Sequence, residues 1–318
     1  MFLSFIIPVY NCEKLITRCV ESIEGQDFDD FEVILVNDGS LDDSLDVCNR
    51  LVDTYKNITV LTQSNKGASS ARNHGLSIAK GDYVWFVDAD DYITPEIVKT
   101  IYKHAIEKSC DVIAMNYKYI TNNSKNDILL YSKDTDVSSV DYLSDAPCMF
   151  AATKVYKRAS LKGLTFRDGL TNIEDFLFNI QYLATIDSIH TLPNVGYVYD
   201  NTNINSTSRN RSKRNLVKLT NQSLIVHEAI FNQLKSTPKS DVQIAISKQL
   251  NYSILGHLYS LIRFYNPKRL KKVINWYKDK KLYPIGDTGK KSSNRALLLF
   301  NNYSLLLVLS YIKNICKK

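Results

Sequence analysis

Val84-Trp85-Phe86-Val87-Asp88-Ala89-Asp90-Asp91 is an apolar run that ends in three carboxylates. Two more polar motifs follow apolar runs earlier in the chain, Pro8-Val9-Tyr10-Asn11 and Asn37-Asp38-Gly39-Ser40. In a parallel sheet that is covered by helices on both faces, ligands bind at the carboxyl ends of the strands. The three motifs therefore predict a single acidic crevice at one edge of such a sheet.

Short apolar runs alternate with amphipathic stretches over the first third of the chain. Runs of this kind are typical of strands buried on both faces, and they lie at residues 3–8, 32–37, 58–62, 83–88 and 111–117. The amphipathic stretches predict helices at residues 13–23, 45–55, 69–79 and 95–108. Thr94 is expected to cap the last of these helices, with Pro95 at its first position. The alternation predicts an α/β fold with a doubly wound, mostly parallel sheet.

The pattern changes in the second half of the chain. Residues 122–136 are polar and irregular, which predicts a surface loop, and a helix over 173–184 is expected before short strands that reach Tyr199. After about residue 212 the sequence shows long helical patterns without a strand signal. We therefore expect a first domain over residues 1–211 and a basic, mainly helical C-terminal region over 212–318.

Composition favours an ordinary globular protein in a reducing compartment. Hydrophobic residues make up 44% and charged residues 23% of the 318-residue chain. The six cysteines form no C-x-x-C pair, so neither a disulfide framework nor a zinc site is expected from them. The apolar start lacks a basic leader and is interrupted by Pro8, which indicates a first strand rather than a signal peptide. These features predict a cytoplasmic protein.

The positive charge is concentrated at the C-terminal end. Residues 263–318 contain 14 lysines and arginines against two aspartates, whereas the rest of the chain is mildly acidic. Basic and aromatic residues alternate at helical spacing over 268–281, which suits an anionic bilayer surface. A solvated helical face or the interface of a homo-oligomer explains the same pattern. The stretch 296–312 is too interrupted to span a membrane, and both a core helix and a helix lying on the membrane surface remain open for it.

The acidic motif after residue 87 predicts a metal site. Asp88 and Asp90 are spaced to share a hard cation with a diphosphate, and all-oxygen ligands suit Mg²⁺ or Mn²⁺. The absence of a glycine-rich phosphate loop from the first motif adds to the need for such a cation. The alternative is a solvated acidic turn in front of the helix at Pro95.

The other motifs offer groups for a base and for proton transfer. The ionised carboxylate of Asp38 can accept the N3–H of uracil or thymine, and Tyr10 can stack on a base. Arg72 can pair with phosphate or brace Asp38, and Glu174-Asp175 opens a helix where a general base is one interpretation. Ordinary turn, core, surface and helix-dipole roles remain the alternatives for these residues.

Taken in order, these motifs resemble those of inverting family 2 glycosyltransferases with the GT-A fold. The resemblance covers roughly residues 2–200 and includes Tyr10-Asn11, Asn37 to Ser40, Lys66 to Asn73, Asp88 to Asp91, and Glu174-Asp175. It implies a GT-A catalytic domain over residues 1–211. By this likeness, the uracil site would be lined by Pro8, Tyr10 and Asp38, with Arg72 nearby. Asp88 would face the ribose and the metal, Asp90 would be the principal metal ligand, and Asp175 the catalytic base beside Glu174.

The resemblance also implies the reaction and its partners. Asp175 would deprotonate an acceptor hydroxyl that attacks the anomeric carbon of a UDP-sugar, with Mn²⁺ or Mg²⁺ as cofactor and without an enzyme nucleophile. The acceptor would be a lipid-linked oligosaccharide or a glycoprotein glycan in bacterial surface polysaccharide or glycoconjugate synthesis. Peripheral attachment to the inner face of the cell membrane would bring the enzyme close to a lipid-linked acceptor.

The chain departs from the family pattern at two places. Asn37 stands where a first aspartate is more usual, and Asp200 ends a segment that often ends in arginine. We take Arg209 or Arg211 as the candidate replacement for that cation.

Two other function classes fit the sequence less well. A nucleotidyltransferase would need a basic, glycine-rich loop after the first strand, and Pro8-Val9-Tyr10-Asn11-Cys12 stands there. A non-enzymatic nucleic-acid-binding protein would use the basic C-terminal region, but the acidic body argues against it and no nucleic acid is expected as a partner.

Overall fold

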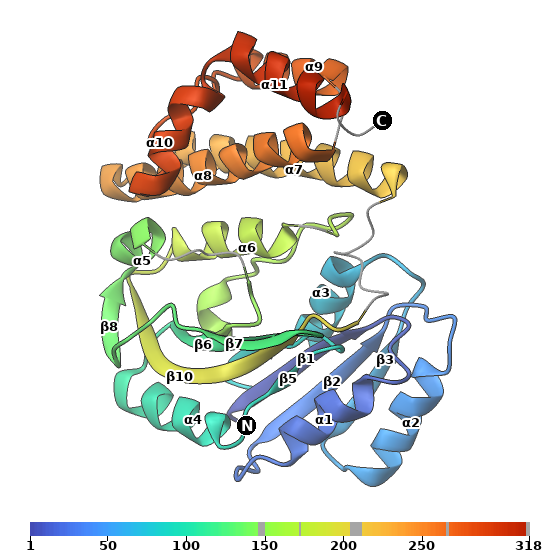
Figure 1. Ribbon diagram of the computed structural model, residues 1–318. Helices are drawn as coiled ribbons and strands as arrows, with labels where there is room; N and C mark the ends of the chain where they lie inside the picture. The colour runs from blue at the N-terminus through green and yellow to red at the C-terminus, as the bar shows by residue number, and fades with distance from the viewer. Residues whose placement is uncertain (146–149, 172, 204–211, 265–266, 316–318) are drawn as a thin grey trace. The chain divides into compact units, whose positions relative to one another are not determined.

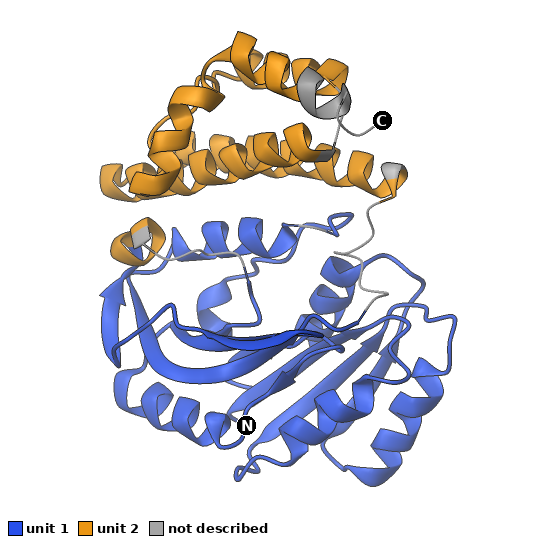
Figure 2. Ribbon diagram, in the orientation of Figure 1, with its two compact units in different colours: residues 1–139, 148–209 blue, residues 140–147, 210–318 orange. Residues whose placement is uncertain are grey.

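The computed structural model describes residues 1–145, 150–171, 173–203, 212–264 and 267–315. The chain divides into two compact units (Figure 2). Unit 1 comprises residues 1–139 and 148–209, and unit 2 comprises residues 140–147 and 210–318. Sequence patterns did not indicate that residues 140–147, most of helix α5 (Ser139–Asp145), group with the C-terminal helices. The predicted division into a domain over residues 1–211 and a helical region over 212–318 stays a prediction.

The first half of unit 1 is a parallel sheet with helices on both faces. Strands β1 (Leu3–Val9), β2 (Phe31–Asn37), β3 (Ile58–Thr62) and β4 (Tyr83–Phe86) pair in the order β3-β2-β1-β4. Helices α1 (Ile16–Glu24) and α2 (Ser44–Thr54) contribute to the core on one face, and α3 (Ala68–Ile78) packs on the other (Figure 1). This arrangement confirms the predicted α/β, doubly wound class.

Mixed pairing completes the sheet, whose order is β3-β2-β1-β4-β9-β6-β10-β5. Strand β9 (Lys154–Lys157) runs antiparallel to both β4 and β6 (Val112–Thr121). Strand β10 (Ser188–Asp200) is parallel to β6 and antiparallel to the short β5 (Tyr92–Ile93). Strand β10 is long enough to extend along the whole of this half of the sheet. Its two ends therefore lie at different edges (Figure 1).

The prediction of a loop over residues 122–136 is wrong. Strand β7 (Ser124–Ile128) forms a hairpin with β6, and β8 (Thr135–Ser138) pairs antiparallel with β10. The side chains of β7 and β8 are almost all exposed. A strand without a buried face shows no apolar alternation, so the sequence pattern could not reveal it.

Helix α4 (Ile97–Lys108) begins two residues later than expected, and the predicted cap is wrong. The Thr94 hydroxyl donates to the carbonyl oxygen of Val195 at 2.7 Å, and the Thr94 N–H donates to the carbonyl of Gly196. Thr94 therefore extends the pairing of β5 with β10 and is not available to cap the helix. Helix α6 (Glu174–Leu183) lies where the sequence predicts it.

Unit 2 is helical, as predicted for the C-terminal region. It contains α7 (Lys213–Ser236), α8 (Ser240–Phe264), α9 (Pro267–Asp279), α10 (Lys291–Phe300) and α11 (Tyr303–Ile315). The buried Tyr277 hydroxyl of α9 contacts His227 of α7 at 2.7 Å and His257 of α8 at 2.6 Å, which joins the three helices. None of the described helices combines the length and the apolar character that crossing a bilayer requires.

Two glycines inside helices allow a matched test of the packing of α3 on the sheet. A Cβ at Gly75 of α3 would lie 2.5 Å from Ile6 Cγ2 of β1, whereas a Cβ at Gly256 of α8 would meet no atom within 4 Å. We predict that Gly75→Ala lowers the free energy of unfolding by about 1–3 kcal/mol through overpacking. Gly256→Ala should raise it by about 0.5–1 kcal/mol, because alanine favours the helix. Denaturant unfolding of both variants measures this, and equal effects of the two substitutions would contradict the close contact.

Candidate active site

The polar motifs of the first two strands and of β4 lie at one edge of the sheet. Val9 at the end of β1 is in register with Asn37 at the end of β2, and the Asp38 N–H donates to the Val9 carbonyl at 2.9 Å. The Val87 N–H, just beyond β4, donates to the carbonyl of Ile6 in β1 at 3.1 Å. The structure therefore brings the residues after these three strands together.

The first motif leaves its aromatic ring accessible. Tyr10 is 42% exposed, and Pro8 is half-buried within β1. An exposed ring at a strand end is not part of the core, so Tyr10 is free to stack on a planar ligand. Asn37 Oδ1 accepts the N–H of Ser40 at 3.1 Å, so the asparagine that replaces the more usual aspartate closes the turn after β2.

Asp38 is buried and holds the segment that leads into α3. Its Oδ1 accepts hydrogen bonds from the Gln63 side chain and the Lys66 N–H, both at 2.8 Å, and its Oδ2 accepts from the Gly67 N–H at 2.7 Å. A carboxylate offers about four acceptor positions, so one remains for a ligand N–H. The uracil contact of Asp38 stays a prediction, and a loop-positioning role is now visible beside it.

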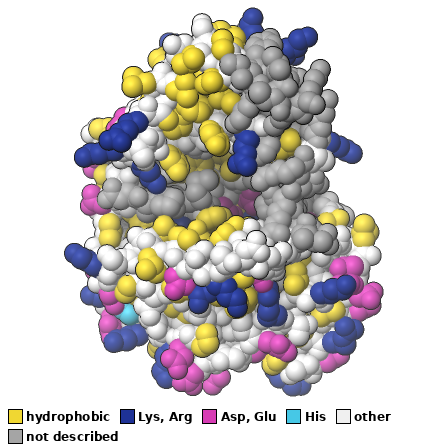
Figure 3. All heavy atoms as spheres, in the orientation of Figure 1, with side chains coloured by type: hydrophobic (Ala, Val, Ile, Leu, Met, Phe, Trp, Pro, Cys, Tyr) yellow, Lys and Arg dark blue, Asp and Glu magenta, His cyan; other side chains and the backbone are white. Residues whose placement is uncertain are grey.

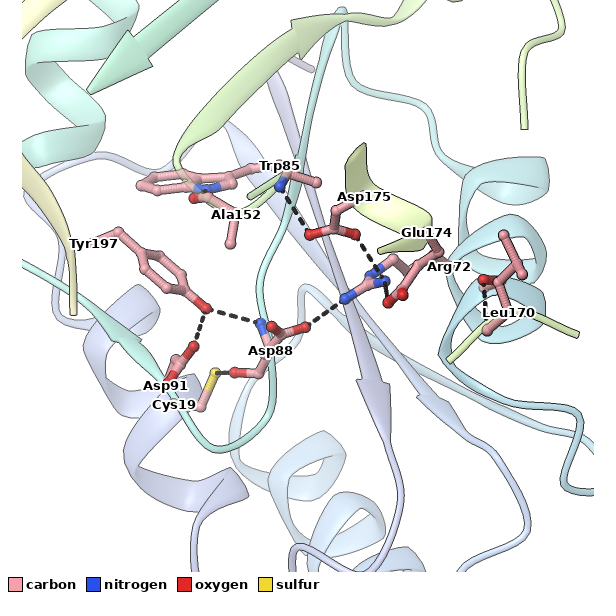
Figure 4. Close-up of polar contacts among 12 residues, drawn as sticks. Cys19, Arg72, Trp85, Asp88, Asp91, Ala152, Leu170, Glu174, Asp175 and Tyr197 are labelled. Atoms are coloured by element: carbon pink, nitrogen blue, oxygen red, sulfur yellow. Dashed lines mark hydrogen bonds and ion pairs between the residues drawn. The ribbon is translucent and has the colours of Figure 1, made fainter. Parts of the chain in front are cut away.

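Arg72 of α3 connects both sides of the site (Figure 4). Its Nη2 lies 2.7 Å from Asp88 Oδ1, and its Nη1 lies 3.0 Å from Glu174 Oε1 and 3.2 Å from Asp175 Oδ1. The side chain is only 5% exposed, and its guanidinium lies 5.2 Å from the centroid of the Phe166 ring. Arg72 therefore pairs with these carboxylates and does not brace Asp38.

The Asp175 carboxyl group is held through both of its oxygens. Its Oδ2 accepts the Ala151 N–H at 2.9 Å, while Oδ1 faces Arg72. Burial raises the pKa of Asp175 to about 7; Arg72 opposes this shift, and the charges of Glu174 and Asp88 add to it. A carboxylate with a pKa near neutrality is suited to general-base chemistry.

The acidic motif after β4 carries more negative charge than its neighbours neutralise. Burial, followed by the charge of Asp88, raises the pKa of Asp90, whose Oδ2 accepts from Asn203 at 3.1 Å. Burial and the charges of Asp90 and Asp88 also raise the pKa of Asp91. Asp91 has a structural role, since it accepts hydrogen bonds from the Tyr197 hydroxyl and the Asp200 N–H.

The donor set fits a hard divalent cation. Asp88 and Asp90 offer carboxylate oxygens, and the raised pKa of Asp90 reflects a negative charge that a cation would neutralise. Arg72 already engages one oxygen of Asp88. Within the described residues, the group of three ligand atoms close enough to hold an ion is a different one, His104, Asp134 and His190. An ion at Asp88 and Asp90 would need ligand or water oxygens to complete its coordination.

The sequence analysis did not identify an arginine side chain that lies beside this acidic motif. Arg18 of α1 lies with Nη1 2.6 Å from Asp200 Oδ2 and donates from Nη2 to the carbonyl oxygen of Asp90 at 2.7 Å. Asp200, the unexpected acid at the end of β10, is thus paired with an arginine from another element. No local pattern could reveal a pair 182 residues apart. Arg209 and Arg211, the cations proposed from the sequence, lie outside the described residues.

The raised pKa of Asp175 makes a prediction for stability. An unfolded aspartate has a pKa of about 3.9, so the folded state binds the Asp175 proton more tightly between that value and about 7. The stability that this proton contributes is present at low pH and is lost as the pH rises through about 7. We predict that Asp175→Asn is more stable than the wild type at about pH 8, by on the order of a few kcal/mol. The difference should shrink toward zero as the pH falls to about 4, and a pH-independent difference in denaturant unfolding would contradict the shift.

Comparison with known sequences shows that the chain is similar to glycosyltransferases. Residues 4–164 match the profile of "Glycosyl transferase family 2". The chain is 38% identical over 135 residues to glycosyltransferase GlyG of Streptococcus pneumoniae, covering 42% of this chain and 44% of that protein. It is 32% identical over 205 residues to the poly(ribitol-phosphate) beta-glucosyltransferase of Bacillus spizizenii, covering 63% of this chain and 32% of the relative. The chain thus spans less than half the length of these curated relatives.

A solved structure extends the likeness to the whole chain. Residues 1–349 of Staphylococcus aureus TarS, in complex with UDP-GlcNAc, superpose with a TM-score of 0.76 at 22% identity, covering all of this chain and 92% of that structure. The similarity shows that the two proteins share the GT-A fold with a helical region after it. The profile match extends over half of the chain and includes the ends of β1, β2 and β4. The chain belongs to glycosyl transferase family 2.

Proposed function

We propose that the protein is an inverting, metal-dependent glycosyltransferase that moves a sugar from a UDP-sugar to a hydroxyl of a glycan acceptor. The observation that carries the proposal is the Arg72 contact, which holds Asp175, with a pKa of about 7, beside the acidic Asp88 motif. Family membership supports glycosyl transfer as the reaction class.

The nucleotide would occupy the edge formed by the ends of β1 and β2. Tyr10 offers an exposed ring for the base, and Asp38 keeps one acceptor position for the N3–H of uracil. Pro8 would shape the wall of this site, and Asp88 would face the ribose. A UDP-linked donor is supported by the TarS structure, which was determined with UDP-GlcNAc.

A divalent cation would be held by Asp88 and Asp90. When bound, Mn²⁺ or Mg²⁺ neutralises charge on the leaving diphosphate. Arg18, which reaches the Asp90 carbonyl, adds a fixed positive charge on the same side. Arg72 serves a different purpose, because its guanidinium is shared between Asp88 and the two acids of α6.

Asp175 would act as the general base. It removes the proton from the acceptor hydroxyl as that oxygen attacks the anomeric carbon and the bond to the diphosphate oxygen breaks. The attack comes from the face opposite the leaving group, so the configuration at this carbon inverts. The proton remains on Asp175, and the electron pair of the broken bond leaves with UDP.

The acceptor would be a glycan of a bacterial surface polymer, either lipid-linked or carried by a glycoprotein. The relatives support this class, since one of them is named for glucosyl transfer to poly(ribitol-phosphate). In both cases the group that accepts the sugar would be a glycan hydroxyl.

An activity assay tests the proposed roles. Purified protein is incubated with Mn²⁺ or Mg²⁺ and a panel of UDP-sugars, and UDP release is measured with and without a glycan acceptor. Asp175→Asn should lower the rate by roughly 10²–10⁴-fold, as expected for loss of a general base. Glu174→Gln is the matched control, and its loss should be clearly smaller because Glu174 only neighbours the base.

Chelation of the metal should abolish release, and added Mn²⁺ or Mg²⁺ should restore it. Equal losses in Asp175→Asn and Glu174→Gln would remove the assignment of the base. No UDP release from any donor, together with no thermal stabilisation by UDP plus Mn²⁺, would overturn the proposed function.

We further propose that unit 2 docks on an anionic membrane at its cytoplasmic face. Leu298 of α10 is 86% exposed, and Leu305 and Val308 of α11 are 41% and 52% exposed. Hydrophobic side chains gather over the C-terminal helices in Figure 3, with basic side chains around them. Apolar side chains that insert between lipid headgroups, flanked by lysines, are typical of helices that lie on membranes.

Sedimentation with liposomes tests this docking. The triple variant Lys268→Gln, Lys271→Gln, Lys272→Gln should bind anionic vesicles about 100-fold more weakly at low salt, since each lysine contributes about 1 kcal/mol. The control triple Lys108→Gln, Lys125→Gln, Lys162→Gln removes the same charge from unit 1 and should bind like the wild type. Wild-type protein that ignores anionic vesicles and forms a stable dimer in solution would instead support the homo-oligomer interface.

A further inference from the structure

A second group of polar side chains lies where α4, the start of β8 and the first residues of β10 meet. His104 Nε2 of α4 is 2.8 Å from Asp134 Oδ2, and His190 Nε2 of β10 is 2.9 Å from Asp134 Oδ1. One ligand atom from each of the three residues lies within 4.8 Å of the others. The two rings stack with their centroids 4.9 Å apart. Three donor atoms therefore converge on one small volume.

The other nitrogen of each ring is oriented as in metal-binding histidines. His104 Nδ1 lies 2.8 Å from the carbonyl oxygen of Thr100, which can only accept, so this nitrogen carries a hydrogen. His190 Nδ1 lies 2.8 Å from Asp136 Oδ1, a carboxylate neighbour. Metal-ligating histidines almost always donate their second N–H to a carbonyl or a carboxylate, which fixes the ring. Both rings thus direct Nε2 toward Asp134.

The number of hydrogens that the two rings would have to carry favours a cation between His104, Asp134 and His190. An ionised Asp134 only accepts hydrogen bonds, so without a metal both Nε2 atoms must carry hydrogens in addition to those on Nδ1. Two fully protonated rings would then stack 4.9 Å apart, with His190 only 1% exposed. A single divalent ion can replace these two hydrogens at the same total charge.

We propose that His104, Asp134 and His190 bind a divalent transition-metal ion, for which Zn²⁺ is the best match. Two imidazoles and one carboxylate are ligands that Zn²⁺ commonly takes, whereas Mg²⁺ prefers oxygen alone. Three protein ligands leave a fourth position for water. The Asp134 side chain is 50% exposed, so the ion reaches the site directly from solvent.

The site is separate from the acidic motif of the active site. His190 lies near the first residue of β10, whereas Tyr197 and Asp200, which contact Asp91, lie near its last. Ten residues of extended strand cover on the order of 30 Å. The two centres also differ in chemistry, because Asp88 and Asp90 offer carboxylate oxygens, whereas this group adds two imidazole nitrogens to one carboxylate. The ion would act as a clamp within unit 1.

The clamp would join α4 to the edge of the sheet where β8 pairs with β10. Asp134 directly precedes β8, a four-residue strand that pairs with β10 from Ser138↔Ser188 to Thr135↔Thr191. A metal that bridges Asp134 to α4 and β10 fixes this exposed strand against both. Binding of the ion to the folded state alone raises its stability.

Metal titration of the untagged full chain tests the proposal. After chelator treatment, the protein is titrated with Co²⁺, whose visible absorption reports four-coordinate nitrogen and oxygen ligation, and bound Zn²⁺ is counted by elemental analysis. We expect one tight ion per chain and a higher melting temperature with Zn²⁺. Asp134→Ala, at the half-exposed position, and His104→Ala should each weaken binding by more than about 100-fold. Asp136→Ala removes the hydrogen-bond partner of His190 Nδ1 and should weaken Zn²⁺ binding about 10–100-fold.

Two controls separate this site from others. His74→Gln replaces a histidine of α3 whose ring contacts the Gln63 side chain, and Asp90→Asn removes a ligand of the proposed active-site metal. Both should bind Zn²⁺ with wild-type affinity. The proposal is overturned if the wild type binds no tight Zn²⁺, or if Asp134→Ala and His104→Ala retain wild-type affinity.

Discussion

The Arg72 guanidinium is the contact on which the geometry of the site depends. It comes from α3 and reaches Asp88 after β4 and both acids at the start of α6, so one buried group joins the α3–β4 region to a helix about 100 residues further along the chain. One positive charge cannot neutralise three carboxylates, and burial, together with the remaining negative charge, raises the pKa of Asp175 to about 7. The same excess charge makes the edge of the sheet receptive to a cation. The general base and the cation site that we propose thus both depend on one unbalanced ion cluster.

The order of the strands explains why these groups meet. Parallel pairing of β2, β1 and β4 brings their carboxyl ends to one edge, and Asp38 fixes the segment from which α3 carries Arg72 to that edge. Strand β10 then supplies Tyr197 and Asp200 to the same region and His190 to another. The long strand therefore serves two polar centres with different ligand chemistry, one of carboxylates and one of imidazoles.

Features that depend on local pattern were predictable, and those that depend on distant partners were not. The apolar runs of β1 to β4 predicted buried parallel strands because a strand covered on both faces must be apolar throughout. Strands β7 and β8 were not predicted because their side chains are mostly exposed, so apolar and polar residues do not alternate along them. The cap predicted at Thr94 is wrong because the Thr94 hydroxyl donates to a carbonyl oxygen of β10. The Arg18–Asp200 pair could not be predicted because the two residues are too far apart in the sequence for any spacing rule. The family motifs indicated which residues gather, but not that Arg72 holds Asp175.

We propose that the nucleotide and its cation lie between the ends of β1, β2 and β4, with Asp175 facing them. A crystal structure of the protein with UDP and Mn²⁺, using the anomalous signal of manganese, measures this directly. We expect the manganese peak beside Asp90 and the diphosphate, the uracil next to Tyr10 and Asp38, and the Asp175–Arg72 pair retained. A manganese peak or a uracil ring away from this edge of the sheet would contradict it.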